Sequence, residues 1–306
     1  MGIVSPGDGA QGQGTHETLP AMQYHPRPSL PATRTRFSEN LHSIVLAAGC
    51  DRRPEGHTAA LHGAPIPRQF CSFGGSRSLL QQTLDRLGRV TPPRRTFVIV
   101  DHLQLARATW QIAGYPGATL VAQPCDRGTA AGAFLPLLHV LLRDPSALVL
   151  LTPSDHGVED VSAYARAVAR AVNAVRDDPS LIVVFGAPEG ALFDTRMTVG
   201  RADRLLALYR PLQDLVRHLQ LWLDALAGGE RARLTELYRL IPELDFTRDV
   251  LGNAPGLAVH VLPRRVGWTD LGTPDRLTAW ALRRHPLPVS RDAPVGAGRD
   301  AAARFA

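Results

Sequence analysis

Two aspartates stand where this sequence could do chemistry. Asp155 follows the apolar run 147–151, and Asp270 comes shortly after the apolar run 257–262. Both runs are expected to be strands, and carboxylates at the ends of neighbouring strands can converge on one divalent cation. Each aspartate also has a simpler explanation, because Asp155 could cap a helix after Ser154 and Asp270 could form an Asx-turn. The sequence alone leaves both alternatives open.

A second group of candidate residues follows the first expected strand, 43–48. Gly49 ends this strand, and Asp51, Arg52 and Arg53 come directly after it. A turn here could hold a triphosphate on its backbone N–H groups, with help from the basic side chains. A glycine after a strand is more often only a turn, so this segment is a weak indication by itself.

These residues belong to a series of short motifs in a fixed order. The motifs are LAAGCDRR at 46–53, PRQF at 67–70, SLLQ at 78–81, QPCDRGTA at 123–130, PSDH at 153–156 and GWTDLGT at 267–273. Together they resemble the motifs of the sugar-1-phosphate nucleotidyltransferases, in particular those of the mannose-1-phosphate guanylyltransferases. The resemblance covers roughly residues 42–282, and PSDH followed by the WxDxG pattern is its most specific part.

The resemblance implies roles for individual residues. Asp155 and Asp270 correspond to the family's carboxylate ligands of Mg²⁺, and Asp194 lies on the sugar-phosphate side. The residues assigned to catalysis are Arg53, Arg68 and Asp155, of which Arg68 stands where the family has a lysine. The residues assigned to nucleotide binding are Ala48, Gly49, Arg53, Gln123, Arg127, Thr129 and Ser154.

The implied reaction is a nucleotidyl transfer. A phosphate oxygen of a sugar 1-phosphate, such as mannose 1-phosphate, attacks the α-phosphorus of a nucleoside triphosphate, by resemblance GTP, and pyrophosphate leaves. Such a reaction asks the protein mainly to align the two phosphates and to neutralise developing charge. The expected partners are therefore these two small molecules, and the expected cofactor is Mg²⁺.

The sequence departs from the family pattern at several points. Asp51 replaces a glycine in the first loop, Gln123 replaces a glutamate, and Asp194 replaces an asparagine. After 183–188 a stretch of several tens of residues that binds the sugar in the family has no counterpart. We therefore expect weak nucleotide binding and little turnover with mannose 1-phosphate. Two alternatives stay open: a non-catalytic relative with a regulatory or vestigial role, and an enzyme that uses a smaller acceptor.

The elements that must position these residues alternate between strands and helices. Continuous apolar runs between helical segments predict an α/β fold, with a Rossmann-like, mainly parallel or mixed sheet covered by helices on both faces. The expected strands are 43–48, 96–100, 119–122, 147–151, 181–185 and 257–262. The expected helices are 78–87, 103–113, 129–142, 161–175, 204–226 with a break near Pro211, 232–240, and one from Pro274.

Composition narrows the functional classes. The 306 residues carry a net charge of +6, and every basic residue other than histidine is an arginine. These arginines are scattered, which argues against a nucleic-acid-binding surface. No stretch approaches the ~20 apolar residues of a membrane span. Three cysteines without a CxxC pair fit a reducing cytoplasm.

The sequence also suggests an organisation in three parts. We expect a disordered leader at 1–41, a nucleotidyltransferase domain at 42–285 and a flexible tail at 286–306, because the two ends lack any apolar period. A homo-oligomer is left open.

Overall fold

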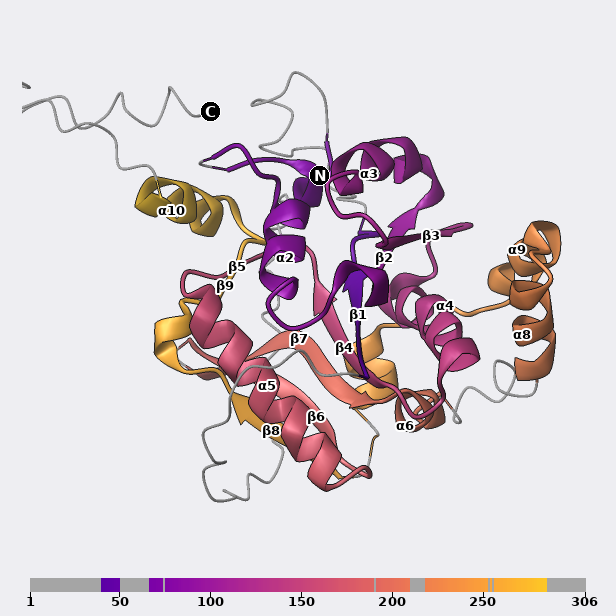
Figure 1. Ribbon diagram of the computed structural model, residues 1–306. Coiled ribbons are helices and arrows are strands. Elements are labelled where there is room, and N and C mark those ends of the chain that lie inside the picture. The colour runs from indigo at the N-terminus through magenta and orange to yellow at the C-terminus, as the bar shows by residue number, and fades with distance from the viewer. Residues whose placement is uncertain are drawn as a thin grey trace, which may run out of the picture.

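A mixed seven-stranded sheet between two layers of helices forms the body of the computed structural model (Figure 1). The structure describes residues 40–49, 66–73, 75–189, 191–209, 218–252, 254 and 256–284, without the side chains at 189 and 191–193. The strands of this sheet are β1 (Leu41–Leu46), β2 (Thr96–Asp101), β3 (Thr119–Gln123), β4 (Leu148–Pro153), β6 (Ile182–Glu189), β7 (Ala191–Arg201) and β8 (Leu257–Val261).

The strand order is β3-β2-β1-β4-β7-β6-β8. Strand β7 runs antiparallel to both of its neighbours, and the other pairs are parallel. Strands β1 and β4 are adjacent, with Leu46 opposite Pro153. The loops after these two strands therefore leave the sheet at the same edge, where ligands of such sheets bind.

Apolar side chains of the strands alternate between two cores, one on each face of the sheet. Helices α2 (Leu79–Leu87), α3 (Leu105–Ile112) and α5 (Val161–Asp177) pack on one face. The other face is covered by α4 (Gly128–Arg143), α6 (Ala202–Ala207), α8 (Leu219–Ala227), α9 (Arg231–Arg239) and the π-helical turn η4 (Phe246–Leu251). The near-continuous apolar strands of the sequence are thus explained by burial on both faces.

Caps and short turns fix where the helices begin. Ser78 closes a capping box at the start of α2, where its side chain accepts from Gln81 N and Gln81 Oε1 accepts from Ser78 N. Asp160 caps α5 by accepting from Ala163 N at 2.8 Å. Single turns of 3₁₀ helix are η1 (Arg68–Phe70), η2 (Pro93–Arg95), η3 (His102–Gln104) and η5 (Arg264–Val266).

A second, two-stranded sheet lies beyond the end of β4. Strands β5 (His156–Gly157) and β9 (Thr269–Asp270) pair antiparallel, and helix α10 (Pro274–Arg284) follows β9. Trp280 of α10 packs against this small sheet so closely that a Cβ on Gly157 would lie 2.8 Å from its ring. A glycine is therefore required at this contact.

The α/β class, the mixed sheet and its six expected strands are confirmed. Strand β7 was not expected, and it makes the sheet mixed at its centre. Strand β1 begins at Leu41, which is buried, two residues before its expected start. The rest of the expected leader, the tail and Pro211 lie outside the described residues.

Candidate active site

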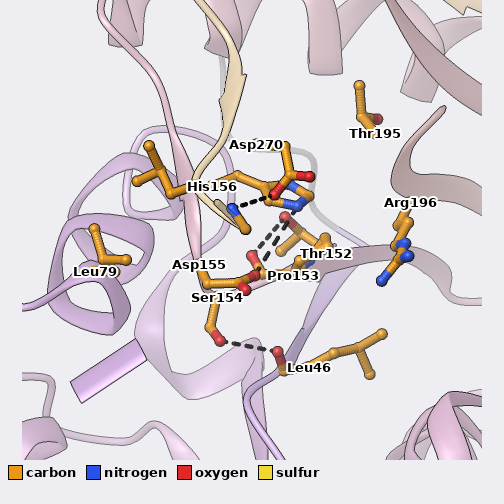
Figure 2. A network of polar contacts seen from close by, with 12 residues as sticks. Leu46, Leu79, Thr152, Pro153, Ser154, Asp155, His156, Thr195, Arg196 and Asp270 are labelled. Atoms are coloured by element: carbon orange, nitrogen blue, oxygen red, sulfur yellow. Dashed lines mark hydrogen bonds and ion pairs between the residues drawn. The ribbon is translucent and has the colours of Figure 1, made fainter. Parts of the chain in front are cut away.

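Asp155 and Asp270 come together through the small sheet. Asp155 follows β4, and the next residue, His156, is the backbone partner of Asp270. Paired residues of antiparallel strands have Cα atoms about 4.5–5.5 Å apart, so the two aspartates lie on neighbouring positions. Figure 2 shows Asp155, His156 and Asp270 side by side, beyond the carboxyl end of β4.

Arg68 joins the two motifs that carry these aspartates. Its Nη2 lies 3.4 Å from Asp155 Oδ2, and its Nη1 donates to the carbonyl of Leu271 at 2.9 Å. The Asp155 side chain is 28% exposed, so its carboxylate is open to a ligand. We call Arg68, Asp155 and Asp270 the carboxylate cluster.

The structure decides between the alternatives for each aspartate. Asp155 is no helix cap, because β5 follows it and Asp160 caps α5 instead. Asp270 does form an Asx-turn, since its Oδ1 accepts from Gly272 N at 2.8 Å. Its Oδ2 lies 3.9 Å from Arg276 Nη1, and the side chain is 29% exposed. One oxygen of Asp270 thus serves the turn, and the other faces a weak, partly solvated ion pair.

His156 and Arg86 lie behind the carboxylate cluster. The His156 ring contacts Trp268 edge to face, with 4.9 Å between ring centroids. Burial lowers the pKa of His156, although the charges of Asp155 and Asp270 act in the opposite direction. Arg86 is buried and donates to the His156 carbonyl at 3.1 Å. Arg86 thus supports the backbone of β5 behind the two aspartates.

The loop after β1 is held from below by two polar side chains. Gln69 Nε2 donates to the carbonyls of Ala47 and Gly49, at 2.9 Å each. Ser154 donates from its hydroxyl to the Leu46 carbonyl at 3.0 Å, as Figure 2 shows. The Ser154 hydroxyl therefore already serves to join the ends of β1 and β4.

The expected phosphate loop is described only in part. Ala48 and Gly49 stand at its start, and no atom of the described residues lies within 4 Å of a Cβ built on Gly49. Gly49 is exposed among these residues. Arg53 and Asp51 lie outside the described residues, so the expectations for them stay predictions.

The other expected nucleotide-binding residues, Gln123, Arg127 and Thr129, form a group that we call the α4 cluster. Gln123 is 1% exposed, and its Oε1 accepts from the Tyr238 hydroxyl at 3.0 Å. Arg127 donates to the carbonyl of Arg239 at 3.0 Å. The structure brings these residues to one end of α4, where Gln123 and Arg127 each bond within the protein, while the buried Nε of Arg127 has no hydrogen-bond partner among the described residues.

The segment before η4 closes the first turn of α4. Thr129 donates from Oγ1 to Asp245 Oδ2 at 2.9 Å and accepts from Phe246 N at 2.8 Å. Gly128 has φ +79°, and a Cβ there would overlap the carbonyl oxygen of Leu244. The segment that leads into η4 thus packs against the first turn of α4.

Asp194 lies on β7, near Asp245 and Thr247 of the segment that contacts the α4 cluster. Its Oδ1 accepts from Arg196 N at 2.8 Å, and Thr247 hydrogen-bonds to its carboxylate. The pKa of the half-buried Asp194 carboxyl is raised, chiefly because burial disfavours its charged form. Figure 2 places its neighbours Thr195 and Arg196 across from the carboxylate cluster.

The donor set of the site suits Mg²⁺ better than a closed metal centre. Among the described residues, no group of three or more His, Cys, Asp or Glu side chains could hold a metal ion. Asp155 and Asp270 supply carboxylate oxygens alone. Mg²⁺ is commonly bound by one or two carboxylates plus the phosphates of a substrate, so these residues fit that ion.

Sequence reasoning missed the supporting residues Gln69, Arg86 and Arg196. Gln69 lies within the PRQF motif, and an arginine at a core-facing position of α2 was a visible signal for Arg86. Arg196 gave no signal, because its backbone conformation depends on a strand pairing that the sequence does not reveal. No helix in the described part of the chain is long and apolar enough to cross a membrane.

No model of a known protein family matches the chain. It is 28% identical over 130 residues to the alginate biosynthesis protein AlgA of Pseudomonas aeruginosa, which covers 40% of this chain and 25% of AlgA. Mannose-1-phosphate guanylyltransferase 2 of Escherichia coli O157:H7 is 27% identical over 154 residues, 47% of this chain and 29% of that protein. The chain thus spans well under half of these two relatives.

A longer match is the xanthan biosynthesis protein XanB of Xanthomonas campestris pv. campestris. It is 30% identical over 276 residues, which cover 75% of this chain and 57% of XanB. The expected resemblance to the sugar-phosphate nucleotidyltransferases is confirmed by these relatives.

Solved structures agree on the fold. A mannose-1-phosphate geranyltransferase from Thermus thermophilus superposes with a TM-score of 0.59 at 22% identity, covering 76% of each chain. A mannose-6-phosphate isomerase from Helicobacter pylori gives a TM-score of 0.57 at 15% identity, covering 76% of this chain and all of that one, 100%. At such identities the likeness shows the fold alone.

Proposed function

We propose that this chain, a relative of the sugar-phosphate nucleotidyltransferases, transfers a nucleotidyl group from a nucleoside triphosphate to a sugar 1-phosphate. GTP and mannose 1-phosphate are the substrates that the mannose-1-phosphate guanylyltransferase named above suggests. The observation that carries the proposal is the pairing of β5 with β9, which unites Asp155 and Asp270 at the edge where β1 and β4 end.

The reaction joins two phosphates and needs little covalent chemistry from the protein. An oxygen of the sugar phosphate forms a bond to the α-phosphorus, and the bond from that phosphorus to pyrophosphate breaks. The work left to the chain is to hold both phosphates in line and to offset their negative charge.

The carboxylate cluster can help to offset the negative charge of the phosphates. Asp155 and Asp270 would hold Mg²⁺, which when bound offsets the charge of the phosphates. Arg68 already lies against Asp155 and can donate to phosphate oxygens from the same position. The exposed fractions of the two aspartates, 28% and 29%, leave their carboxylates within reach of a ligand.

The nucleotide is expected beside the loop after β1. Gln69 and Ser154 fix the start of this loop, and Gly49 is exposed among the described residues. Backbone N–H groups of such a loop suit phosphate oxygens. Ala48 and Gly49, with Arg53 further on, are the residues that we assign to the triphosphate.

The acceptor side is reduced. Strands β6 and β7 form a hairpin in which Glu189 lies opposite Ala191, so no further domain intervenes there. We therefore expect turnover with mannose 1-phosphate to be weak, and a smaller or differently shaped sugar 1-phosphate to do better. A cytoplasmic location and a homo-oligomer stay predictions.

The proposal is tested by pyrophosphate release. The full chain is incubated with Mg²⁺ and each of four nucleoside triphosphates, in combination with a panel of sugar 1-phosphates. Release that requires both substrates and stops when the cation is chelated would support the proposal. Release with no pair in the panel, or release that is independent of the sugar phosphate, would contradict it.

A further inference from the structure

Arg196 has an unusual backbone on β7. Its φ is +54°, and no other non-glycine residue in the described part of the chain has a positive φ. It lies at a bulge, because Val184 pairs with Thr198 whereas Gly186 pairs with Asp194. Side chains other than glycine are strained in this conformation, and such strain often marks a functional position.

Three hydrogen bonds fix this conformation. Arg196 N donates to Asp194 Oδ1 at 2.8 Å, Thr195 Oγ1 donates to the Phe185 carbonyl at 2.8 Å, and Met197 N donates to Thr195 Oγ1 at 3.3 Å. Thr195 and Met197 are both buried, whereas Arg196 is exposed. The bulge therefore anchors its two neighbours in the sheet and turns the arginine side chain outward.

Among the described residues the guanidinium of Arg196 makes no hydrogen bond or ion pair, although its charge favours the ionised form of the neighbouring Asp194 carboxyl. Arg68 and Arg276, in contrast, each lie near an aspartate of the carboxylate cluster. Burial is the main cause of the lowered pKa of His156, and the charge of Arg196 acts in the same direction. Figure 2 shows Arg196 facing the group of Asp155 and His156 from the side of β7.

The strand order indicates which of the two substrates would lie closer to Arg196. Strand β4, which leads to Asp155, lies between β1 and β7. The loop expected to hold the nucleotide follows β1, on one side of Asp155. Arg196 lies on the other side, where the second phosphate must approach.

We propose that Arg196 binds the phosphate of the acceptor sugar 1-phosphate, an inference that rests on the proposed function. A planar guanidinium can donate two parallel hydrogen bonds to a phosphate, which suits the positioning of an attacking oxygen. Because no hydrogen bond or ion pair to another described residue has to be broken first, this arginine can meet the ligand at little cost in reorganisation. The strained bulge is then explained by the placement of that guanidinium.

The test compares Arg196→Gly and Arg196→Gln with the full wild-type chain. Arg204→Gln is the matched control, since Arg204 is an exposed arginine on α6, which follows the far end of β7. Two quantities are measured: the KM for each substrate, and the equilibrium affinity for inorganic phosphate by calorimetry.

We expect the Arg196 variants to raise the KM for the sugar 1-phosphate and to weaken phosphate binding by about 10- to 100-fold. The KM for the nucleotide and the Arg204→Gln variant should stay within about 2-fold of wild type. Arg196→Gly should unfold at the wild-type temperature or higher, because glycine relieves the strain at this φ. A merely structural arginine would instead lower the unfolding temperature.

The outcomes separate this inference from the proposed function. Turnover with an unchanged KM for the sugar phosphate in both Arg196 variants would overturn the inference and leave the function standing. Phosphate affinity that depends on Arg196, in a chain without turnover for any substrate pair, would support an anion site at Arg196 and contradict the function. Equal phosphate affinity in all variants would overturn the inference.

Discussion

The carboxylate cluster and the α4 cluster were both expected to bind substrate, but they differ in how exposed their side chains are and in which partners those side chains have within the protein. Asp155 and Asp270 keep carboxylates that are more than a quarter exposed. In the α4 cluster, Gln123 is buried against Tyr238, and the Thr129 hydroxyl is shared between Asp245 and Phe246. A motif match therefore identifies a position in the fold, whereas the partners of its side chains decide whether a ligand can use it.

The difference arises from what covers each strand end. The end of β4 leads into the two-residue strand β5, which pairs with β9, and the side chains of Asp155 and Asp270 stay partly exposed there. The end of β3 leads into α4, whose first turn is sealed by residues before η4. Buried polar groups need partners, and here the protein supplies one for Gln123, from Tyr238. The carboxylate cluster is thus the better candidate for chemistry.

The largest expected effect comes from Asp155→Asn. It should lower the rate of pyrophosphate release by about 10²–10³-fold, because a ligand of the Mg²⁺ that would offset the charge of the phosphates is lost. The unfolding free energy should change by less than about 1 kcal/mol, since the ion pair with Arg68 is partly solvated. Asp224→Asn, on the surface of α8, is the control and should leave both quantities unchanged. Equal rates in the two variants would place the chemistry elsewhere.

A smaller effect is expected from Gln123→Ala in the α4 cluster. It should lower the unfolding free energy by about 1–3 kcal/mol, because it removes a buried hydrogen bond and leaves Tyr238 unpaired. Tyr238→Phe removes the same bond from the other side, so the double variant should cost less than the sum of the two. Urea unfolding measures all three. A loss of nucleotide affinity with wild-type stability would instead indicate that Gln123 contacts the nucleotide directly. It would contradict the difference between the two clusters.

Substitutions at two glycines, one at each expected binding region, should have different effects on stability and on nucleotide binding. Gly128→Ala should destabilise the chain by about 1–3 kcal/mol, because the new Cβ meets the Leu244 carbonyl at a positive φ. No described atom lies within 4 Å of a Cβ at Gly49, so Gly49→Ala should leave the unfolding temperature almost unchanged, while it weakens nucleotide binding. Thermal unfolding and nucleotide titration of the same two proteins measure this. The reverse pattern would mean that the phosphates bind at α4.

The strands and helices were predictable because apolar runs and caps carry local information. Strand β7 was not predicted from the sequence, because Asp194, Thr195 and Arg196 interrupt its apolar pattern. Its bulge also breaks the alternation of side chains between the two faces of the sheet. The motifs placed Asp155 correctly after β4, whereas Asp270 lies on β9 and not at the end of β8. Their meeting depends on a pairing between β5 and β9, two short strands far apart in the sequence, which no local pattern encodes.

The partners of the α4 cluster could not be predicted for a similar reason. The π-helical turn η4 was not expected, and only the folded chain brings Asp245 to Thr129. Gln123 and Arg127 match a binding motif in sequence, yet their surroundings come from α9 and the segment before η4. Contacts between distant segments therefore separate the two clusters.

The central claim is that Asp155 and Asp270 act together on one divalent cation. Calorimetric titration of Mg²⁺ in the presence of GTP tests it most directly, with wild type, Asp155→Asn, Asp270→Asn and the double variant. If both carboxylates serve one ion, each single variant should weaken Mg²⁺ binding strongly, and the double variant should lose little more than either one. Independent, additive losses, or Mg²⁺ binding that is unchanged in all three variants, would contradict the claim.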